Sequence, residues 1–292
     1  MRKLLSVMLV LVMASSLFIG CSSNTETTAA ATTAAPETTT SAATEATTVT
    51  DGAYADGVYF ASQPTFGDTG WKYVVTLVVE GGKIVSADWN GGNVAGGKDK
   101  KTLSADGEYG MDWHLQAKAV EDYLIENQSL ENLNYTDEEG HTDSVAGVSI
   151  HVKEFDELVT EALAQGPVGY GKYVDGAFYA EQAEYGDSGW KDTFSATVIS
   201  GYIVSASWNG ISESTDKDKK TASMDGDYPM VANGGASSEW YEQAAMMEDF
   251  LIQTQSVDAI TMDASTHTDT VAGVTISVAS FVELATEALQ LR

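Results

Sequence analysis

The chain has 292 residues, of which 43% are hydrophobic and 9% aromatic, enough apolar material for packed cores in about two domains. With 15 basic against 43 acidic residues, the formal net charge is -28. Such a charge repels nucleic-acid phosphates and excludes a nucleic-acid-binding protein. Cys21 is the only cysteine, so internal disulfides and metal sites built from several cysteines are excluded as well.

The N-terminus has the order of an export signal. Two basic residues precede an apolar run over residues 4–19, and Gly20 stands directly before Cys21, which predicts a signal peptide over residues 1–20. The end of this run resembles a bacterial lipobox, in which the cysteine is lipidated and becomes the mature N-terminus. We therefore expect an extracytoplasmic protein anchored by lipid to the outer face of the cytoplasmic membrane. A plain cleaved signal, or release of the apolar tail as a signalling peptide, remain alternatives.

Residues 21–50 are predicted to form a spacer behind that lipidated cysteine. They consist almost entirely of Thr, Ala, Ser and Glu, a composition with too few bulky side chains to bury a core. We expect a disordered tether with a root-mean-square span of roughly 30 Å.

The remaining chain contains the same pattern twice. Shifted by 119 residues, Gly70-Trp71-Lys72 aligns with Gly189-Trp190-Lys191; shifted by 126, His141-Thr142-Asp143 aligns with His267-Thr268-Asp269. Two copies are too few for a solenoid. They predict tandem domains over residues 51–166 and 167–292, each of a common domain size.

Each copy is predicted to be an α+β domain with an antiparallel, hairpin-based sheet and two helices. Apolar, β-branched runs at 73–80 and 83–89 flank Gly81-Gly82, a pattern typical of a hairpin, and residues 193–208 repeat it. Apolar residues at helical spacing predict the helices. These are expected at 116–127 and 152–164 in the first copy, and around 244–251 and at 278–289 in the second.

The segment before each closing helix carries the most informative residues. It reads Asp-Ser-Val-Ala-Gly-Val-Ser over 143–149 and Asp-Thr-Val-Ala-Gly-Val-Thr over 269–275. A glycine lets backbone approach a ligand closely, a hydroxyl follows two residues later, and amides at the start of the next helix favour a phosphate. A turn that ends in a Ser/Thr helix cap is the alternative.

These residues resemble the motif Asp-x-x-Ser/Thr-Gly-Ala-Ser/Thr of the FMN-binding domain. That family occurs in membrane-associated flavin subunits of sodium-pumping NADH:quinone oxidoreductases and Rnf-type complexes, and in flavin-carrying lipoproteins of Gram-positive extracellular electron transfer. A flavin transferase there joins FMN through its phosphate to the last hydroxyl. The resemblance covers both copies and implies up to two covalent FMN groups in phosphoester linkage. The implied attachment sites are Ser149 and Thr275, with Asp143, Gly147, Asp269 and Gly273 as motif partners.

Both copies depart from the family motif in the same way. Ala146 and Ala272 stand where Ser or Thr is usual, and Val148 and Val274 where Ala is usual. Two functions follow from the resemblance and its departures. The first is a lipid-anchored electron carrier, more an electron-transfer protein than an enzyme, which relays electrons from a membrane quinone-linked dehydrogenase to extracellular acceptors or envelope reductases. The second is a flavin-free surface module that binds a small ligand or a protein partner.

Three further groups of residues have two interpretations each. The lysine clusters are either solvated loops or charges that offset phosphate or meet an acidic partner. The hairpin tryptophans are either core residues or rings that stack on a flavin, and the histidines before the motif either form structural hydrogen bonds or transfer protons. They are Lys98, Lys100 and Lys101 with Lys217, Lys219 and Lys220; Trp71, Trp89, Trp190 and Trp208; and His141 and His267.

Overall fold

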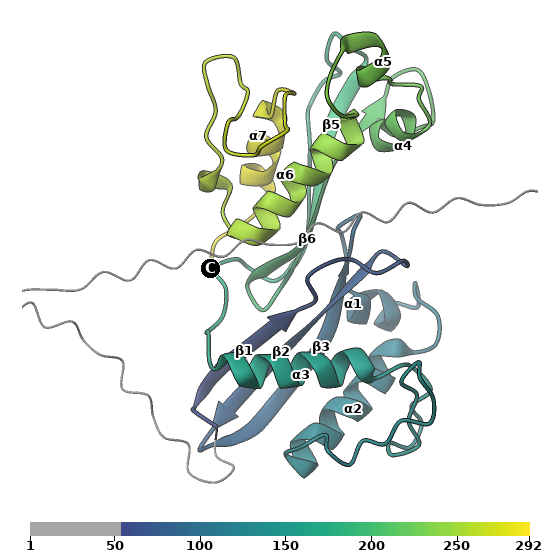
Figure 1. The fold of residues 1–292 in the computed structure, drawn as a ribbon, viewed down its shortest axis with the longest axis vertical. Helices are drawn as coiled ribbons and strands as arrows, with labels where there is room; N and C mark the ends of the chain where they lie inside the picture. The colour runs from purple at the N-terminus through teal and green to yellow at the C-terminus, as the bar shows by residue number, and fades with distance from the viewer. Residues whose placement is uncertain (1–53) are drawn as a thin grey trace, which may run out of the picture. The chain divides into compact units, whose positions relative to one another are not determined.

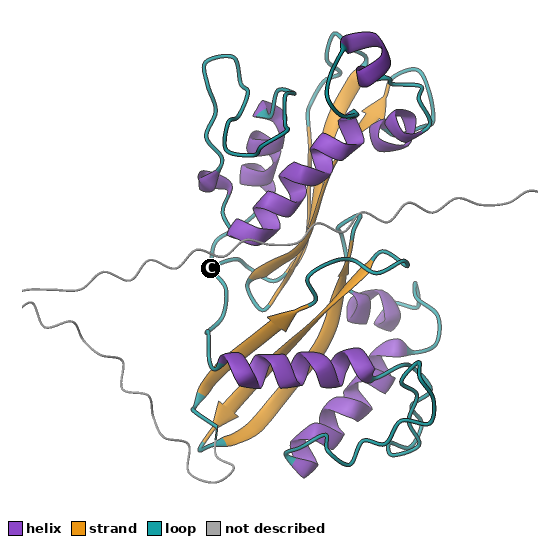
Figure 2. Cartoon of the chain, viewed as in Figure 1, coloured by secondary structure: helices purple, strands orange, loops and turns teal. Residues whose placement is uncertain are grey.

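The computed structural model describes residues 54–292, an α+β protein with two three-stranded antiparallel sheets (Figure 2). The predicted signal peptide, Cys21 and the tether lie outside the described residues. Among residues 54–292, none of the helices combines the length and apolarity that crossing a bilayer requires.

The elements fall into a first half, residues 54–166, and a second half, residues 167–292 (Figure 1). The first half contains β1 Gly57–Ser62, β2 Trp71–Glu80, β3 Lys83–Asn93, α1 Lys100–Ala105, α2 Trp113–Asn127 and α3 Lys153–Gln165. The second contains β4 Gly176–Glu181, β5 Trp190–Ile199, β6 Tyr202–Ser212, α4 Lys219–Met224, α5 Met230–Gly234, α6 Trp240–Thr254, the short 3-10 helix η1 Val257–Ala259 and α7 Ala279–Ala288.

The predicted hairpins are present. Gly81 and Gly82 join β2 to β3 with φ angles of 58° and 74°, and positive φ at both positions is the geometry that a two-residue hairpin turn needs. In the second half, Ser200 and Gly201 take the same place with φ angles of 54° and 83°. The predicted long helices are also present, whereas strands β1 and β4 and helices α1, α4 and α5 were not predicted.

Each half has its own apolar core between the sheet and the long helices. In the first half, α3 packs on β1 and β2, and α2 packs on β3 (Figure 1). Trp89 is 1% exposed, with its ring centroid 5.0 Å from that of Trp113 and 5.4 Å from that of Phe155. Trp208 has the same place in the second half, 5.4 Å from the ring of Phe281. Trp89 and Trp208 are therefore core residues.

The second face of β2 contacts the hairpin of the second half. Val74 forms a small buried cluster with Ile199 and Val204, and the Thr76 hydroxyl donates a 2.7 Å hydrogen bond to the hydroxyl of Ser200. These contacts explain why nearly all of β2 is shielded from water, although the helices of the first half cover only one side of its sheet.

A buried carboxylate joins three elements in each half. In the first, Glu121 on α2 accepts hydrogen bonds from the backbone N–H of Trp89 on β3, at 2.7 Å, and from Nζ of Lys101 on α1, at 2.6 Å. In the second, Glu248 accepts from the N–H of Trp208 at 2.6 Å and pairs with Lys220 at 2.7 Å. Both carboxylates are 4% exposed. Because an unpaired buried charge is costly, each ion pair fixes the short lysine-bearing helix against the sheet.

The pKa of Glu248 gives this arrangement a measurable pH dependence. Burial raises that pKa to about 7, against the opposing attraction of Lys220. A carboxyl group whose pKa is raised by folding stabilises the fold below its unfolded pKa, and this contribution is lost as the pH rises through 7. Glu248→Gln mimics the protonated form, so its free energy of unfolding relative to the parent should increase by about 1–3 kcal/mol between pH 4.5 and pH 8. Urea unfolding at several pH values measures this difference.

The exposed Glu287 on α7 provides the matched control. Glu287→Gln should leave the pH dependence of the parent unchanged. A Glu248→Gln variant that differs from the parent by the same free energy at every pH would contradict the buried titration.

Candidate functional site

A buried or half-buried glutamine holds each motif hydroxyl in place. Ser149 lies in the loop between α2 and α3, where its N–H donates to Oε1 of Gln116 at 2.7 Å and its hydroxyl donates to the same atom at 3.2 Å. In the second half, Oε1 of Gln243 accepts from the N–H and hydroxyl of Thr275, at 2.7 and 3.3 Å, and from the N–H of Ile276 at 3.2 Å. Each glutamine thus fixes the backbone at the hydroxyl, while Ser149 and Thr275 remain exposed.

The motif glycines allow the loop to adopt a backbone conformation with positive φ. Gly147 and Gly273 have φ angles of 81° and 90°, which residues with a Cβ rarely adopt. A Cβ on Gly147 would meet no atom within 4 Å, so its requirement comes from the backbone angle and not from close packing. The loop turns at these glycines and presents the hydroxyl two residues later.

The motif aspartates lie apart from these contacts. Asp143 and Asp269 are exposed, and no side chain or amide in residues 54–292 donates a hydrogen bond to either carboxylate. The structure therefore brings Ser149 together with Gln116 in the first half, and Thr275 together with Gln243 in the second. Neither motif aspartate belongs to these hydrogen-bond networks.

The residues that depart from the FMN-binding motif leave the hydroxyl-bearing residues Ser149 and Thr275 exposed. Val274 is 6% exposed and belongs to the core of the second half, and Val148 packs against the core of the first. Ala146 and Ala272 are exposed. The valines thus have a packing role inside the turn, while the alanines lie on its outer side.

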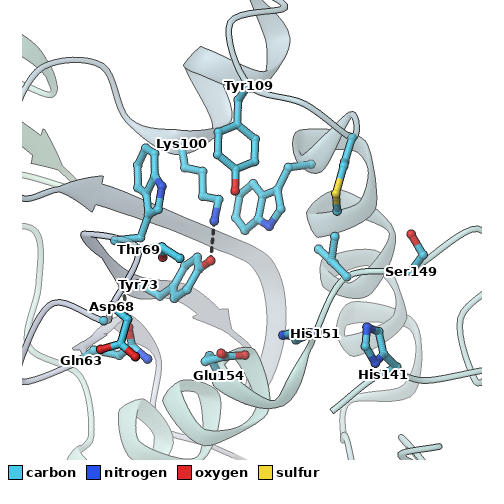
Figure 3. Close-up of a pocket in the computed structure, with 15 residues that line it drawn as sticks. Gln63, Asp68, Thr69, Tyr73, Lys100, Tyr109, His141, Ser149, His151 and Glu154 are labelled. Carbon is cyan, nitrogen blue, oxygen red and sulfur yellow. Dashed lines mark hydrogen bonds between the residues drawn. The ribbon is translucent and has the colours of Figure 1, made fainter. Parts of the chain in front are cut away.

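A pocket of about 480 Å³ opens beside Ser149 in the first half (Figure 3). Loop 67–69, strand β2, helix α1, the start of α2 and the segment that ends in α3 all contribute to its walls, so it combines segments far apart in the sequence. Its lining residues are Gln63, Gly67, Asp68, Thr69, Trp71, Tyr73, Lys100, Tyr109, Met111, Trp113, His141, Ser149, Ile150, His151 and Glu154.

Lys100 lies inside an aromatic cage in this pocket. Its Nζ is 4.5 to 5.0 Å from the ring centroids of Trp71, Tyr73, Tyr109 and Trp113, and it donates a hydrogen bond to the Tyr73 hydroxyl. The residue is only 2% exposed. Burial lowers the pKa of Lys100 to about 8, against the opposing charge of Glu154. The rings also favour the ammonium form through cation–π attraction.

Glu154, on α3, faces Lys100 from the opposite side of the pocket (Figure 3). Its Oε2 atom is buried, and residues 54–292 offer it no hydrogen-bond donor. A buried carboxylate oxygen without a donor is costly, because the lost hydration is not replaced. The pocket therefore contains an acceptor that a bound molecule can satisfy.

Two histidines close the pocket on the side of Ser149. The rings of His141 and His151 meet edge to face with centroids 4.3 Å apart, and Nδ1 of His141 lies 2.5 Å from Oδ2 of Asp137. His141 therefore has a structural hydrogen bond and also lines the pocket. In the second half, Ser277 stands where the first half has His151.

The equivalent lysine of the second half has a different partner. Lys219 lies 4.4 Å from the ring of Trp240, but its Nζ pairs with Oδ1 of Asp192 at 3.1 Å. Asp192 occupies the position of Tyr73, and its Oδ2 accepts a 2.5 Å hydrogen bond from Ser280, which occupies the position of Glu154. The polar groups at this place satisfy one another.

The interpretation of the lysine clusters as solvated loops is wrong for the buried lysines. Lys100 and Lys219 are 2% and 8% exposed, and Lys101 and Lys220 pair with buried glutamates. Lys98 and Lys217 are more exposed, yet each bridges two carboxylates of its own half. The acidic partners of Lys101, Lys219 and Lys220 lie 13 to 28 residues away along the chain, so local sequence spacing did not indicate these pairs. A sequence signal for these short helices was available in Asp99 and Asp218, which occupy the helix-capping positions. Each accepts a hydrogen bond from the N–H of a threonine three residues later.

Comparison with known proteins identifies relatives without functional descriptions. No protein-family model matches the chain, and no curated protein matches it. A solution NMR structure from Clostridium thermocellum is 45% identical, over 38% of this chain and 90% of that chain, with a TM-score of 0.33. A crystal structure from Clostridium perfringens is 29% identical, over 39% and 84%, with a TM-score of 0.32.

The role of Gln243 as a clamp can be tested by removing its acceptor. Gln243→Leu leaves the N–H groups of Thr275 and Ile276 without this partner, so the free energy of unfolding should fall by about 1–3 kcal/mol. Amide hydrogen exchange at these two residues should also accelerate. Gln116→Leu, the equivalent change in the first half, should leave exchange at Thr275 and Ile276 unchanged. Equal exchange in parent and Gln243→Leu protein would show that the loop is held by other contacts.

Proposed function

We propose that this protein is a lipid-anchored, extracytoplasmic electron carrier made of two tandem copies of an FMN-binding domain. FMN would be attached by phosphoester to Ser149 in residues 51–166 and to Thr275 in residues 167–292. The observation that carries the proposal is the position of Ser149, an exposed hydroxyl on the rim of an aromatic-walled pocket of about 480 Å³.

The residues at the first site fit a phosphate-linked flavin. The pocket volume lies within the range of small-molecule sites, which are commonly lined by aromatic side chains with a few polar groups. Trp71, Tyr109 and Trp113 supply flat apolar walls for a planar ring. Lys100 supplies a positive charge and Glu154 a buried acceptor.

The side chains of the protein would orient and shield the group. Gln116 and Gln243 hold the attachment loops, so that the hydroxyl and the adjacent amide keep one geometry. The aromatic walls exclude water from one end of the first site. When bound, FMN supplies one- and two-electron transfer, and the protein supplies orientation and electrostatics.

Covalent attachment suits a protein outside the cytoplasm. A cofactor that dissociates there is diluted into the medium, whereas a phosphoester retains it. We propose that a flavin transferase loads the protein and that a membrane quinone-linked dehydrogenase donates its electrons. Extracellular acceptors or envelope reductases would then receive them, with the lipid on Cys21 keeping the carrier at the membrane.

Intact mass after denaturation tests the proposal, because only covalent flavin survives denaturation. Coexpression of the mature chain with a flavin transferase should add two units of FMN less one water each. Ser149→Ala and Thr275→Ala should each remove one unit, and in-gel flavin fluorescence should fall by about half.

Ser144 and Thr270 provide matched controls, because they lie in the same loops five residues before each attachment site. Ser144→Ala and Thr270→Ala should retain both flavins. An unmodified, non-fluorescent protein, both from coexpression and from the native host, would overturn the electron-carrier function in favour of the flavin-free binding module.

A further inference from the structure

We propose that only the first of the two sites binds the flavin ring itself, an inference that rests on the proposed function. In the first half, Lys100 and Glu154 recognise a ring edge that carries adjacent hydrogen-bond acceptors and a donor. In the second half, the equivalent groups are already bonded to each other, so the ring is held there by its phosphoester alone.

Lys100 has hydrogen-bonding capacity to spare. An ammonium group has three donors, and residues 54–292 provide Nζ of Lys100 with one acceptor, the Tyr73 hydroxyl. The surrounding rings stabilise its charge but accept no conventional hydrogen bond. A carbonyl oxygen or ring nitrogen of a bound molecule can therefore take a remaining donor.

Glu154 supplies the complementary group. Its buried Oε2 has no donor within the described part of the chain, although it lines the same pocket as Lys100. A ring N–H that donates to this carboxylate relieves the cost of the buried acceptor. An acceptor for Lys100 and a donor for Glu154 on one planar edge describe an imide, the group at the pyrimidine end of the isoalloxazine ring.

The walls of the pocket favour a planar ring between these polar groups. Trp71 and Trp113 are 8% and 3% exposed, and both line the pocket with Tyr109. Contacts with aromatic faces add to the affinity of a flat heteroaromatic molecule. The chemical class that fits best is thus a planar heteroaromatic imide.

The second half has no such unsatisfied pair. Lys219 and Asp192 form an ion pair at 3.1 Å, and Ser280 donates to the second oxygen of Asp192. A ring edge would have to break these bonds to bind, and no buried acceptor without a donor would gain a hydrogen bond in return. The exchange of Tyr73 and Glu154 for Asp192 and Ser280 is therefore sufficient to remove ring recognition.

Riboflavin is the appropriate probe, because it contains the ring but no phosphate. Mature protein expressed without a flavin transferase should bind one riboflavin per chain, measured by quenching of riboflavin fluorescence and by calorimetric stoichiometry. Lys100→Met and Glu154→Leu should each weaken binding by about tenfold or more. Tyr73→Asp, which offers Lys100 the partner that Lys219 has, should have the same effect. Thermal unfolding checks that each variant is folded.

A matched variant in the second half serves as a control. Ser280→Ala, the change matched to Glu154→Leu, retains the Lys219–Asp192 ion pair and should leave the affinity and stoichiometry of riboflavin unchanged. 3-Methylriboflavin, whose imide nitrogen has no hydrogen to donate to Glu154, should bind the parent protein about tenfold or more weakly. Absence of riboflavin binding, two riboflavins per chain, or folded Lys100→Met and Glu154→Leu variants with parental affinity would each overturn the inference.

The result is distinguishable from the test of attachment. Ser149→Ala should abolish covalent mass at the first site but retain riboflavin binding. If the chain gains two FMN units yet does not bind riboflavin, the proposed function is supported and ring recognition is contradicted. If it binds riboflavin but gains no covalent mass, ring recognition is supported and the electron carrier with attached flavin is contradicted.

Discussion

The local architecture of each half depends on the hydrogen bonds of one buried glutamate. Glu121 accepts a hydrogen bond from a backbone N–H of the sheet and another from an ammonium group on α1, so it positions a strand, a short helix and a long helix at once. With Lys101 directed to this carboxylate, the preceding Lys100 points into the aromatic pocket. A single buried ion pair thereby determines where the neighbouring charge can act, even though its own contribution to stability is reduced by desolvation.

Local patterns were sufficient to predict most of the regular structure. Apolar periodicity and Gly81-Gly82 predicted the hairpins and the long helices, because turn chemistry and amphipathicity are encoded by near neighbours. Strand β1 and helix α1 are only six residues long, and α1 begins with charged residues, so neither gave a clear signal. The candidate attachment residues Ser149 and Thr275 came from motif resemblance. The cage around Lys100 depends on contacts between distant segments that spacing alone does not encode.

The two halves show that one backbone arrangement can carry different interiors. Both have a lysine beside a tryptophan at the start of a long helix, both have a glutamine under the motif hydroxyl, and both have a glutamate joined to the sheet. The difference lies in the side chain opposite the lysine, which is a tyrosine in one half and an aspartate in the other. A phenol accepts one hydrogen bond from the ammonium but does not neutralise its charge, whereas a carboxylate pairs with that charge directly.

The clamped loop also bears on when a modification can take place. Gln116 and Gln243 hold the loop from beneath, and the positive φ angles of Gly147 and Gly273 turn it so that the following hydroxyl faces solvent. Under the proposed function, a modifying enzyme would therefore meet its target as a shaped surface on a folded domain. Recognition can depend on that shape as well as on the sequence around the hydroxyl, and chains that have failed to fold would not present it.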